Sequence, residues 1–209
     1  MTNARRLSLE VDILGIENET REQKPEESLA ERYKVTFPEG LTDKDIELIV
    51  LQCEHQHATS PEQIKGMAEA YKEAKELAQD LERLNKLTAE DIEELIFRLA
   101  VLIEPEKNKS GFRTVPARFA NGKSALDPEL VQRAMENFFP AYAEGLMEAV
   151  EYYKEFEQIH PWLDGNGRVG DLLWKIDVMR KTGVWPDELP PNIFEENGLA
   201  SLAQEKEQG

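Results

Sequence analysis

The sequence predicts a mainly α-helical protein, and two kinds of pattern support this prediction. Along several segments, apolar residues recur at the three- and four-residue spacing of one buried helical face. Most of these segments begin after Ser, Thr or Asp and end at Pro or Gly, which are residues that start and stop helices. A chain of 209 residues can form one sizeable domain with a hydrophobic core and terminal extensions.

Three helices are expected in the first half of the chain. Thr42, Ser60 and Thr88 each precede one of them as an N-cap residue. Pro105 ends the third helix, because proline cannot continue one. The apolar side chains that these helices would bury include Ile49, Val50, Cys53, Ile64, Met67, Tyr71, Ile92, Leu95, Ile96 and Leu99.

Helical patterns return in the second half of the chain. Asp127 and Pro128 start a helix that is expected to be interrupted at Pro140. The next run presents apolar residues toward the core, namely Tyr142, Leu146, Ala149, Val150, Tyr153 and Phe156. A last helix buries Val169, Leu172, Leu173, Ile176 and Met179, and Gly183 is its expected C-terminal stop.

Residues 160–170, HPWLDGNGRVG, concentrate most of the potential chemistry. Gly165, Asn166 and Gly167 allow successive backbone N–H groups to converge at the positive end of the following helix. With Arg168 beside them, these groups predict a phosphate-binding site. Taken alone, a Gly-Asn-Gly turn is common before helices, so the prediction depends on the combination.

Two side chains in this loop have the chemistry that a bound phosphate requires. Asp164 is a hard oxygen ligand that could hold Mg²⁺ against the phosphates. His160 carries the imidazole best suited to take a hydroxyl proton near neutral pH, although a single histidine is more often structural. The sequence therefore predicts a metal ligand and a general base.

This loop resembles the core motif of the Fic/Doc family, which runs His-Pro-Phe, two residues with an acidic second, Gly-Asn-Gly-Arg, two more, then a second Arg. His160, Pro161 and residues 164–168 match it, and Trp162 replaces the Phe that anchors the loop. Family members typically transfer a phosphate-containing group, most often AMP from ATP, onto a protein hydroxyl. The resemblance implies a helical bundle with a β-hairpin flap beside the catalytic loop, His160 as base and magnesium on Asp164.

Residues 111–122, GFRTVPARFANG, predict that flap. Phe112 and Thr114 favour extended structure, and Asn121 with Gly122 forms a tight-turn pair. Family members carry a similar hairpin. The resemblance implies that Arg113 and Thr114 of this segment bind the target. An extended target segment can add to the edge of such a hairpin, whereas an ordinary surface hairpin is the alternative.

Asp171 stands where the family has its second arginine, which is expected to reach the terminal phosphates of ATP. Unit charges ~6 Å apart at a dielectric of ~20 interact by about 3 kcal/mol, so this reversal disfavours a triphosphate. Asp171 could instead neutralise Arg168 or Lys175, each within one helical turn. Three consequences are left open. The donor carries fewer phosphates, the donor is held by residues elsewhere in the protein, or the motif binds without catalysing transfer.

Charge and composition restrict the partners. The 42 acidic and 25 basic residues give a net charge of -17, which disfavours binding to nucleic acid. No apolar run has membrane-spanning length and the N-terminus lacks a signal-peptide core, so no membrane partner is expected. Cys53 is the only cysteine, and a cytoplasmic location is expected, with signal-independent export left open.

The chain divides into an N-terminal extension with a helix (1–59), a Fic-like core (60–185) and a C-terminal segment (186–209). Alternating apolar residues from Leu7 to Ile13 indicate a short strand. Many family members are inhibited by a helix that carries Ser or Thr, three residues, Glu, then Gly or Asn. This strict motif is absent from the sequence. The nearest segment, NIFEEN at 192–197, has Asn in the hydroxyl position; a separate inhibitory protein and no control are the alternatives.

The leading hypothesis is a Fic-like transferase that moves AMP or another phosphate-containing group from a nucleotide or nucleotide-linked donor onto a side-chain hydroxyl of a protein target. His160 would act as base, Asp164 would hold magnesium, and Gly165 to Arg168 would stabilise the transferred phosphoryl group. A catalytically degenerate interaction module and a demodifying phosphodiesterase are the alternatives.

Overall fold

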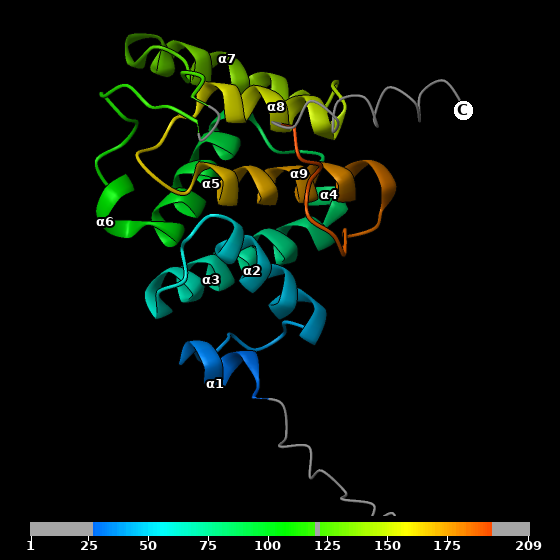
Figure 1. Cartoon of the computed structure of the whole chain (residues 1–209). Helices are drawn as coiled ribbons and strands as arrows, with labels where there is room; N and C mark the ends of the chain where they lie inside the picture. The colour runs from blue at the N-terminus through cyan, green and yellow to red at the C-terminus, as the bar shows by residue number, and fades with distance from the viewer. Residues whose placement is uncertain (1–26, 120–121, 194–209) are drawn as a thin grey trace, which may run out of the picture.

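The structure is a computed structural model, and it describes residues 27–119 and 122–193. These ranges form helices without a strand, which confirms the mainly helical prediction (Figure 1). The helices are α1 (Leu29–Tyr33), α2 (Asp43–His55), α3 (Pro61–Gln79), α4 (Leu81–Leu84), α5 (Ala89–Ile103), α6 (Pro105–Asn108), α7 (Pro128–Glu144), α8 (Ala149–Ile159) and α9 (Asn166–Thr182).

The predicted helix starts are confirmed. Thr42, Ser60 and Thr88 each accept a hydrogen bond from the backbone N–H three residues later, and the side chain of that later residue accepts one from the backbone N–H of the cap. At the other end of the bundle, Gly183 follows α9 with φ of 73°, the left-handed conformation of a C-terminal stop. Local sequence therefore determines where these helices begin and end.

Helix α9 runs through the centre of the molecule, between α8 on one side and α3 on the other (Figure 1). It also contacts α5. Because it is surrounded, α9 buries charged as well as apolar side chains, including Arg168, Asp171, Lys175 and Asp177. Each buried charge needs a partner, since an unpaired ion in a protein interior is strongly unfavourable.

The expected interruption at Pro140 is wrong. Helix α7 continues through Pro140 to Glu144 and ends at Gly145, which has φ of 65°. A proline inside a helix removes one hydrogen bond, but buried Phe139 and Tyr142 pack on both sides of it. Leu146, expected in the core, is 81% exposed because it lies in the connection after Gly145.

The predicted two-stranded flap is not confirmed. In the described part of residues 111–126, the chain reverses with one isolated antiparallel bridge between Arg118 and Ser124. The Phe119 amide donates to the carbonyl of Lys123 at 2.9 Å. Asn121 of the predicted turn lies outside the described residues. Pro116, which has no N–H to donate, limits pairing on this arm.

The N-terminal extension contributes to the same hydrophobic core as the rest of the chain. Ile49, Val50 and Cys53 of α2 are buried in one cluster with side chains of α3, α5, α7, α8 and α9. The strand predicted at 7–13 and most of 192–197 lie outside the described residues. No helix in the described ranges is long and apolar enough to cross a membrane.

Gly66 permits the close packing of α3 against α5. A Cβ atom at this position would lie 2.3 Å from the backbone oxygen of Leu102. We therefore expect Gly66→Ala to destabilise the fold by about 1–3 kcal/mol, although alanine favours an isolated helix by about 1 kcal/mol. Urea unfolding would measure this. The exposed neighbour Lys65→Ala should change stability by less than about 0.5 kcal/mol, and equal stability of both variants would contradict the contact.

Candidate active site

The loop between α8 and α9 is closed by a side chain from the start of α9. The Asn166 amide accepts a hydrogen bond from the Trp162 N–H at 2.8 Å and donates one to the Trp162 carbonyl at 3.0 Å. The Trp162 ring is fully buried and packs on Phe97 and Phe112, with ring centroids 4.8 and 4.9 Å away. Asn166 and Trp162 thus fix the ends of the bend between them.

His160 lies at the C-terminal cap of α8 in the left-handed conformation, with φ of 51°. Its ring packs edge-on against Phe119, with centroids 5.2 Å apart, and its side chain remains 24% exposed. Nδ1 is a buried atom. Burial, and next the charge of Arg113, lower the pKa of His160 to about 4, so the imidazole is neutral at physiological pH. A neutral imidazole can act as a base.

Arg113 holds the backbone around His160. Its guanidinium donates to the carbonyl oxygens of His160 at 2.6 Å and Ile159 at 3.2 Å, and to those of Val115 and Leu126. The residue is only 2% exposed. The structure therefore places Arg113 beneath the loop, where it joins the flap region to the end of α8.

Thr114, the other residue assigned to the flap, lies next to Arg113 but is exposed. The Arg113 amide also donates to the Pro161 carbonyl at 2.9 Å, so this arm of the flap region is tied to the loop. Target binding by the two residues remains a prediction, and of the two only Thr114 presents its side chain at the surface.

The bend itself is tightly packed. Gly165 has φ of 78°, and a Cβ there would lie 2.8 Å from Cγ2 of Ile103. Gln52 of α2 donates to the Gly167 carbonyl at 3.0 Å. The first N–H groups of α9, those of Asn166 and Gly167, have no acceptor within the helix because no preceding turn exists. They are the donors available to an anion.

Arg168 is committed to an ion pair that the sequence pattern did not indicate. It is 1% exposed, and Nη2 lies 2.7 Å from Oε1 of Glu104 and 3.4 Å from Oδ1 of Asp164. Glu104 also accepts a bond from Gln63 at 2.7 Å. Two acids and two bases, Glu104, Asp164, Arg168 and Lys107, thus form a charge-balanced cluster beside the bend.

Asp164 forms the accessible edge of this cluster, with its side chain 38% exposed. Burial acts to raise its pKa, but hydrogen bonds from Lys107 and the Gly165 amide outweigh burial and hold the pKa below its usual value. The residue is therefore ionised, and the Lys107 ammonium marks a position where a cation contacts it. One ionised carboxylate together with donor phosphates fits the way Mg²⁺ is bound at phosphate sites. Within the described ranges, no cluster of three or more metal-ligating side chains occurs.

Asp171, the altered motif position, lies in the core and pairs with Lys175 at 3.5 Å. Both side chains are almost completely buried, at 1% and 0% exposure. Burial raises the pKa of Asp171 to about 6, against the opposing effect of Lys175. Of the two pairings considered from the sequence, the structure shows the one with Lys175, so the negative charge of Asp171 has a compensating cation one turn further along α9.

Glu157 is a buried carboxyl that sequence reasoning missed. It is 3% exposed, and burial raises its pKa to about 8. The spacing contained a signal, because Glu157 precedes His160 by three residues and therefore occupies the adjacent turn of the same helix. Glu104 and Lys107 had no such signal, since they lie more than fifty residues before the bend.

The raised pKa of Glu157 predicts a pH effect on stability. Because the folded pKa of about 8 exceeds the ordinary value of 4.5, the stabilisation is complete below pH 4.5 and is lost as pH rises through about 8. One such proton contributes a slope of up to about 1.4 kcal/mol per pH unit. Glu157→Gln should remove this slope from urea unfolding measured across that range. Identical slopes in the two proteins would show that Glu157 is ionised in the folded state at neutral pH.

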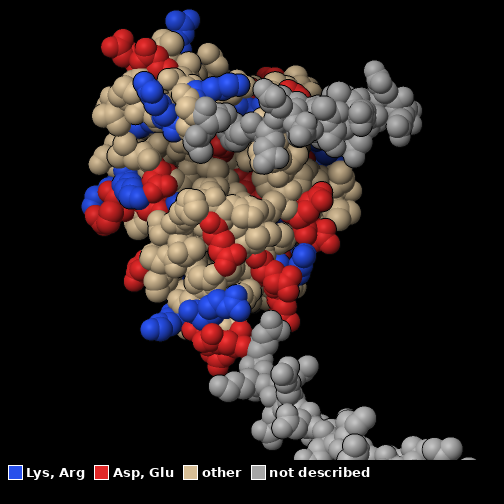
Figure 2. Space-filling model, in the orientation of Figure 1, with Lys and Arg blue, Asp and Glu red and all other residues tan. Residues whose placement is uncertain are grey.

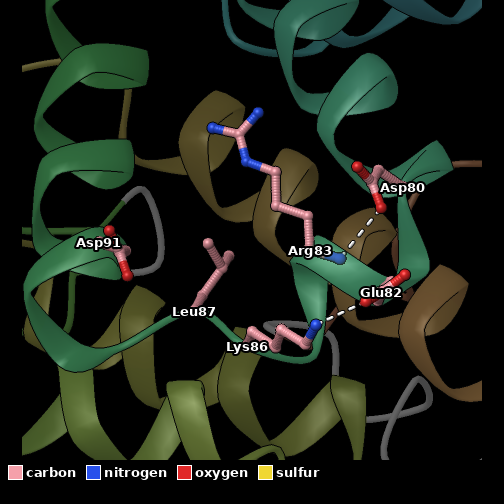
Figure 3. Close-up of a pocket in the computed structure, with 6 residues that line it drawn as sticks. All are labelled: Asp80, Glu82, Arg83, Lys86, Leu87 and Asp91. Atoms are coloured by element: carbon pink, nitrogen blue, oxygen red, sulfur yellow. Dashed lines mark hydrogen bonds and ion pairs between the residues drawn. The ribbon is translucent and has the colours of Figure 1, made fainter.

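Of two hollows in the surface of the described residues, one contains no residue of the loop and the other adjoins the loop. A hollow of about 430 Å³ at α4 and the start of α5 is lined by Asp80, Glu82, Arg83, Lys86, Leu87 and Asp91, none of which belongs to the loop (Figure 3). A second, of about 520 Å³, adjoins the loop: it is lined by Ser124 to Leu126, by α7 and by Glu155, Gln158 and Ile159 of α8.

The family model described as the Fic/DOC family matches residues 77–175, a segment that runs from the end of α3 through the loop and into α9. Residues 77–175 of the chain are therefore similar to the Fic/DOC family. This similarity supports a transferase of the Fic type in general terms. The match includes His160, the bend and Asp171, so the altered position lies within the matched segment.

Comparison with solved structures finds Fic-1 (residues 134–508) from C. elegans, with a TM-score of 0.44 and 19% sequence identity. The similarity covers 80% of this chain and 50% of that one, so the chain spans about half the length of that structure. A search of curated proteins returned no match.

Proposed function

We propose that this Fic-like protein transfers AMP or another phosphate-containing group from a nucleotide or nucleotide-linked donor to a hydroxyl of a protein target. The observation that carries the proposal is the juxtaposition of a neutral, partly exposed His160 with the free amides at the start of α9, joined by a loop that Asn166 holds closed. The amides would bind the phosphate, and the imidazole would take the proton of the attacking hydroxyl.

Other residues of the site would bind the metal ion and the target protein. Asp164 would hold Mg²⁺, which when bound supplies positive charge to the donor phosphates. The Lys107 ammonium would have to move aside from Asp164, which its 48% exposure allows. Thr114, exposed beside the loop, would contact the target chain. A separate inhibitory protein is the proposed means of control.

The altered position shapes the proposed donor. With Asp171 paired to Lys175 inside the core, no arginine of this helical turn reaches outward, so a second or third phosphate would be held from elsewhere. Donors with a diphosphate or a nucleotide-linked group are therefore favoured over a triphosphate. Nucleic acid is not a proposed partner, because acidic and basic side chains are interspersed on the face in Figure 2 without a continuous basic band.

A second candidate is an interaction module without catalysis. Nη2 of Arg168 is paired with Glu104 and Asp164 and the residue is only 1% exposed, so the guanidinium is buried away from a donor phosphate. Binding of a protein partner would then be the activity that the Fic fold retains.

Incubation with labelled ATP, CTP, GTP, UTP, ADP and a nucleotide-linked choline, together with a cell extract as the source of target proteins, would separate the two. We expect label on protein with the wild type and a loss of at least about 100-fold with His160→Ala. His57→Ala, a change to a histidine outside the loop, is the matched control. No binding or transfer with any donor would favour the interaction module, and release of a preinstalled group would indicate a demodifying phosphodiesterase.

A further inference from the structure

The side chains of Glu157 and His160 lie beside each other at the end of α8, and the backbone of Glu157 also interacts with the imidazole. Oε2 of Glu157 lies 4.0 Å from Nδ1 of His160. In the described part of the chain, Nδ1 of His160 and Oε1 of Glu157 are both buried without a hydrogen bond. The gap exceeds a hydrogen bond by about 1 Å, and bonds of this type commonly shorten when substrate binds.

Gly170 makes room for this carboxyl. A Cβ atom at Gly170 would lie 2.6 Å from Oε1 of Glu157 and 3.0 Å from Cε2 of Tyr153. The carboxyl therefore occupies a space between α8 and α9 that only glycine leaves open. An unpartnered buried carboxyl costs folding stability, so stability alone does not account for a glutamate at this position.

Among the neighbouring titratable groups, His160 is the one with which the Glu157 carboxyl can form a hydrogen bond. The charges of Arg113 and Asp164 act on the pKa of His160, and the charge of Glu157 acts on the pKa of Tyr153. Among the acid–base contacts of the described residues, Glu157 takes part only in the one with His160, and this contact is an ion pair only when the imidazole is protonated.

We infer that Glu157 is the positioning residue of His160: its carboxyl accepts the Nδ1–H and so leaves Nε2 as the nitrogen that takes the target proton. A neutral imidazole carries one N–H, and the bond made by one nitrogen decides which nitrogen is the acceptor. This inference rests on the proposed function for its catalytic meaning, whereas the tautomer itself does not depend on that function.

The hydroxyl oxygen of the target forms a bond to the donor phosphorus, and the bond from phosphorus to the leaving group breaks with its electron pair. The hydroxyl proton passes to Nε2 of His160, which then carries N–H groups on both nitrogens. Above its pKa of about 8, the Glu157 carboxylate beside Nδ1 stabilises the imidazolium that results.

The test is nitrogen NMR of the full chain labelled with ¹⁵N-histidine, at a pH above the Glu157 pKa of about 8. His55 and His57 would be assigned by substitution, which leaves the signals of His160. We expect Nδ1–H with an unprotonated Nε2 in the wild type and in Glu157→Gln, whose amide oxygen still accepts. Glu157→Leu should shift His160 toward the Nε2–H form. An Nε2–H form in the wild type, or no change with leucine, would overturn the inference.

Activity and stability of the same variants separate positioning from a structural role. With a donor found in the transfer assay, kcat should fall at least about 100-fold for Glu157→Leu and less than about 10-fold for Glu157→Gln. Leucine should leave the unfolding free energy unchanged or higher, because it replaces an unpartnered carboxyl with an apolar group. Unimpaired kcat in Glu157→Leu would also overturn the inference. If no donor reacts, the transferase proposal fails. The tautomer measured by NMR then still shows whether Glu157 accepts a hydrogen bond from Nδ1 of His160.

Discussion

Replacement of Asp171 by arginine is expected to abolish the folded state rather than restore the family motif. The new guanidinium would lie one turn from Lys175, and both side chains would be in the core, where the two present residues are 1% and 0% exposed. Removing one partner of a buried ion pair already costs about 3–5 kcal/mol, and a like charge adds repulsion. This loss is comparable with the total stability of a typical domain, which is about 5–15 kcal/mol.

A set of variants would separate charge from packing at this position. Asp171→Asn alone should destabilise by about 3–5 kcal/mol, because Lys175 loses its ion partner and keeps the Glu188 carbonyl and the Trp174 ring. The double change Asp171→Leu with Lys175→Met should recover most of this loss, since buried ion pairs are often replaceable by apolar residues. Chemical denaturation would measure all of these. A folded Asp171→Arg protein of wild-type stability would contradict the pairing.

Arg113→Met is the second change with a large expected effect. It would leave four backbone carbonyls without their donor, including those of Ile159 and His160. Hydrogen bonds to a charged group contribute about 1.5–3 kcal/mol each and are not additive, so we expect a loss of at least about 3 kcal/mol. Amide hydrogen exchange should also become faster around His160, because the loop loses the side-chain bonds of Arg113 and keeps the backbone bond from residue 113 to the Pro161 carbonyl.

Two further variants control for this interpretation. Arg118→Met changes an exposed arginine of the same segment and should have little effect on stability. Arg113→Lys should recover only part of the loss, because an ammonium cannot reach four carbonyls with the fork of a guanidinium. Equal exchange rates in Arg113→Met and Arg118→Met would rule out the holding role.

The helices could be predicted from the sequence because their signals are local. The caps at Thr42, Ser60 and Thr88 involve residues three positions apart, and each is found as predicted. Pro140 shows the limit of local rules, since packing of its neighbours keeps α7 continuous. The flap prediction relied on a turn pair and extended residues, which specify a chain reversal but not a ladder of hydrogen bonds.

The segment that forms the candidate site could be predicted from the sequence, but the residues that surround it in the fold could not. Residues 160–168 are contiguous, so the motif placed His160, Asp164 and the bend together. Glu104, which pairs with Arg168, lies between α5 and α6 and accepts a bond from Gln63 of α3, and nothing in the spacing of the sequence indicates these contacts. For Asp171, helical spacing allows two possible partners in α9, and only three-dimensional packing selects Lys175.

The most direct test of the central claim is a titration of ¹⁵N-labelled protein with Mg²⁺ and ADP, ATP or a nucleotide-linked donor, followed by backbone amide shifts. If the bend is the phosphate site, the largest shifts will be those of the Asn166 and Gly167 amides, accompanied by the ring signals of His160. Shifts confined to the hollow at α4, or none at millimolar donor, would contradict the claim that these amides hold the transferred group.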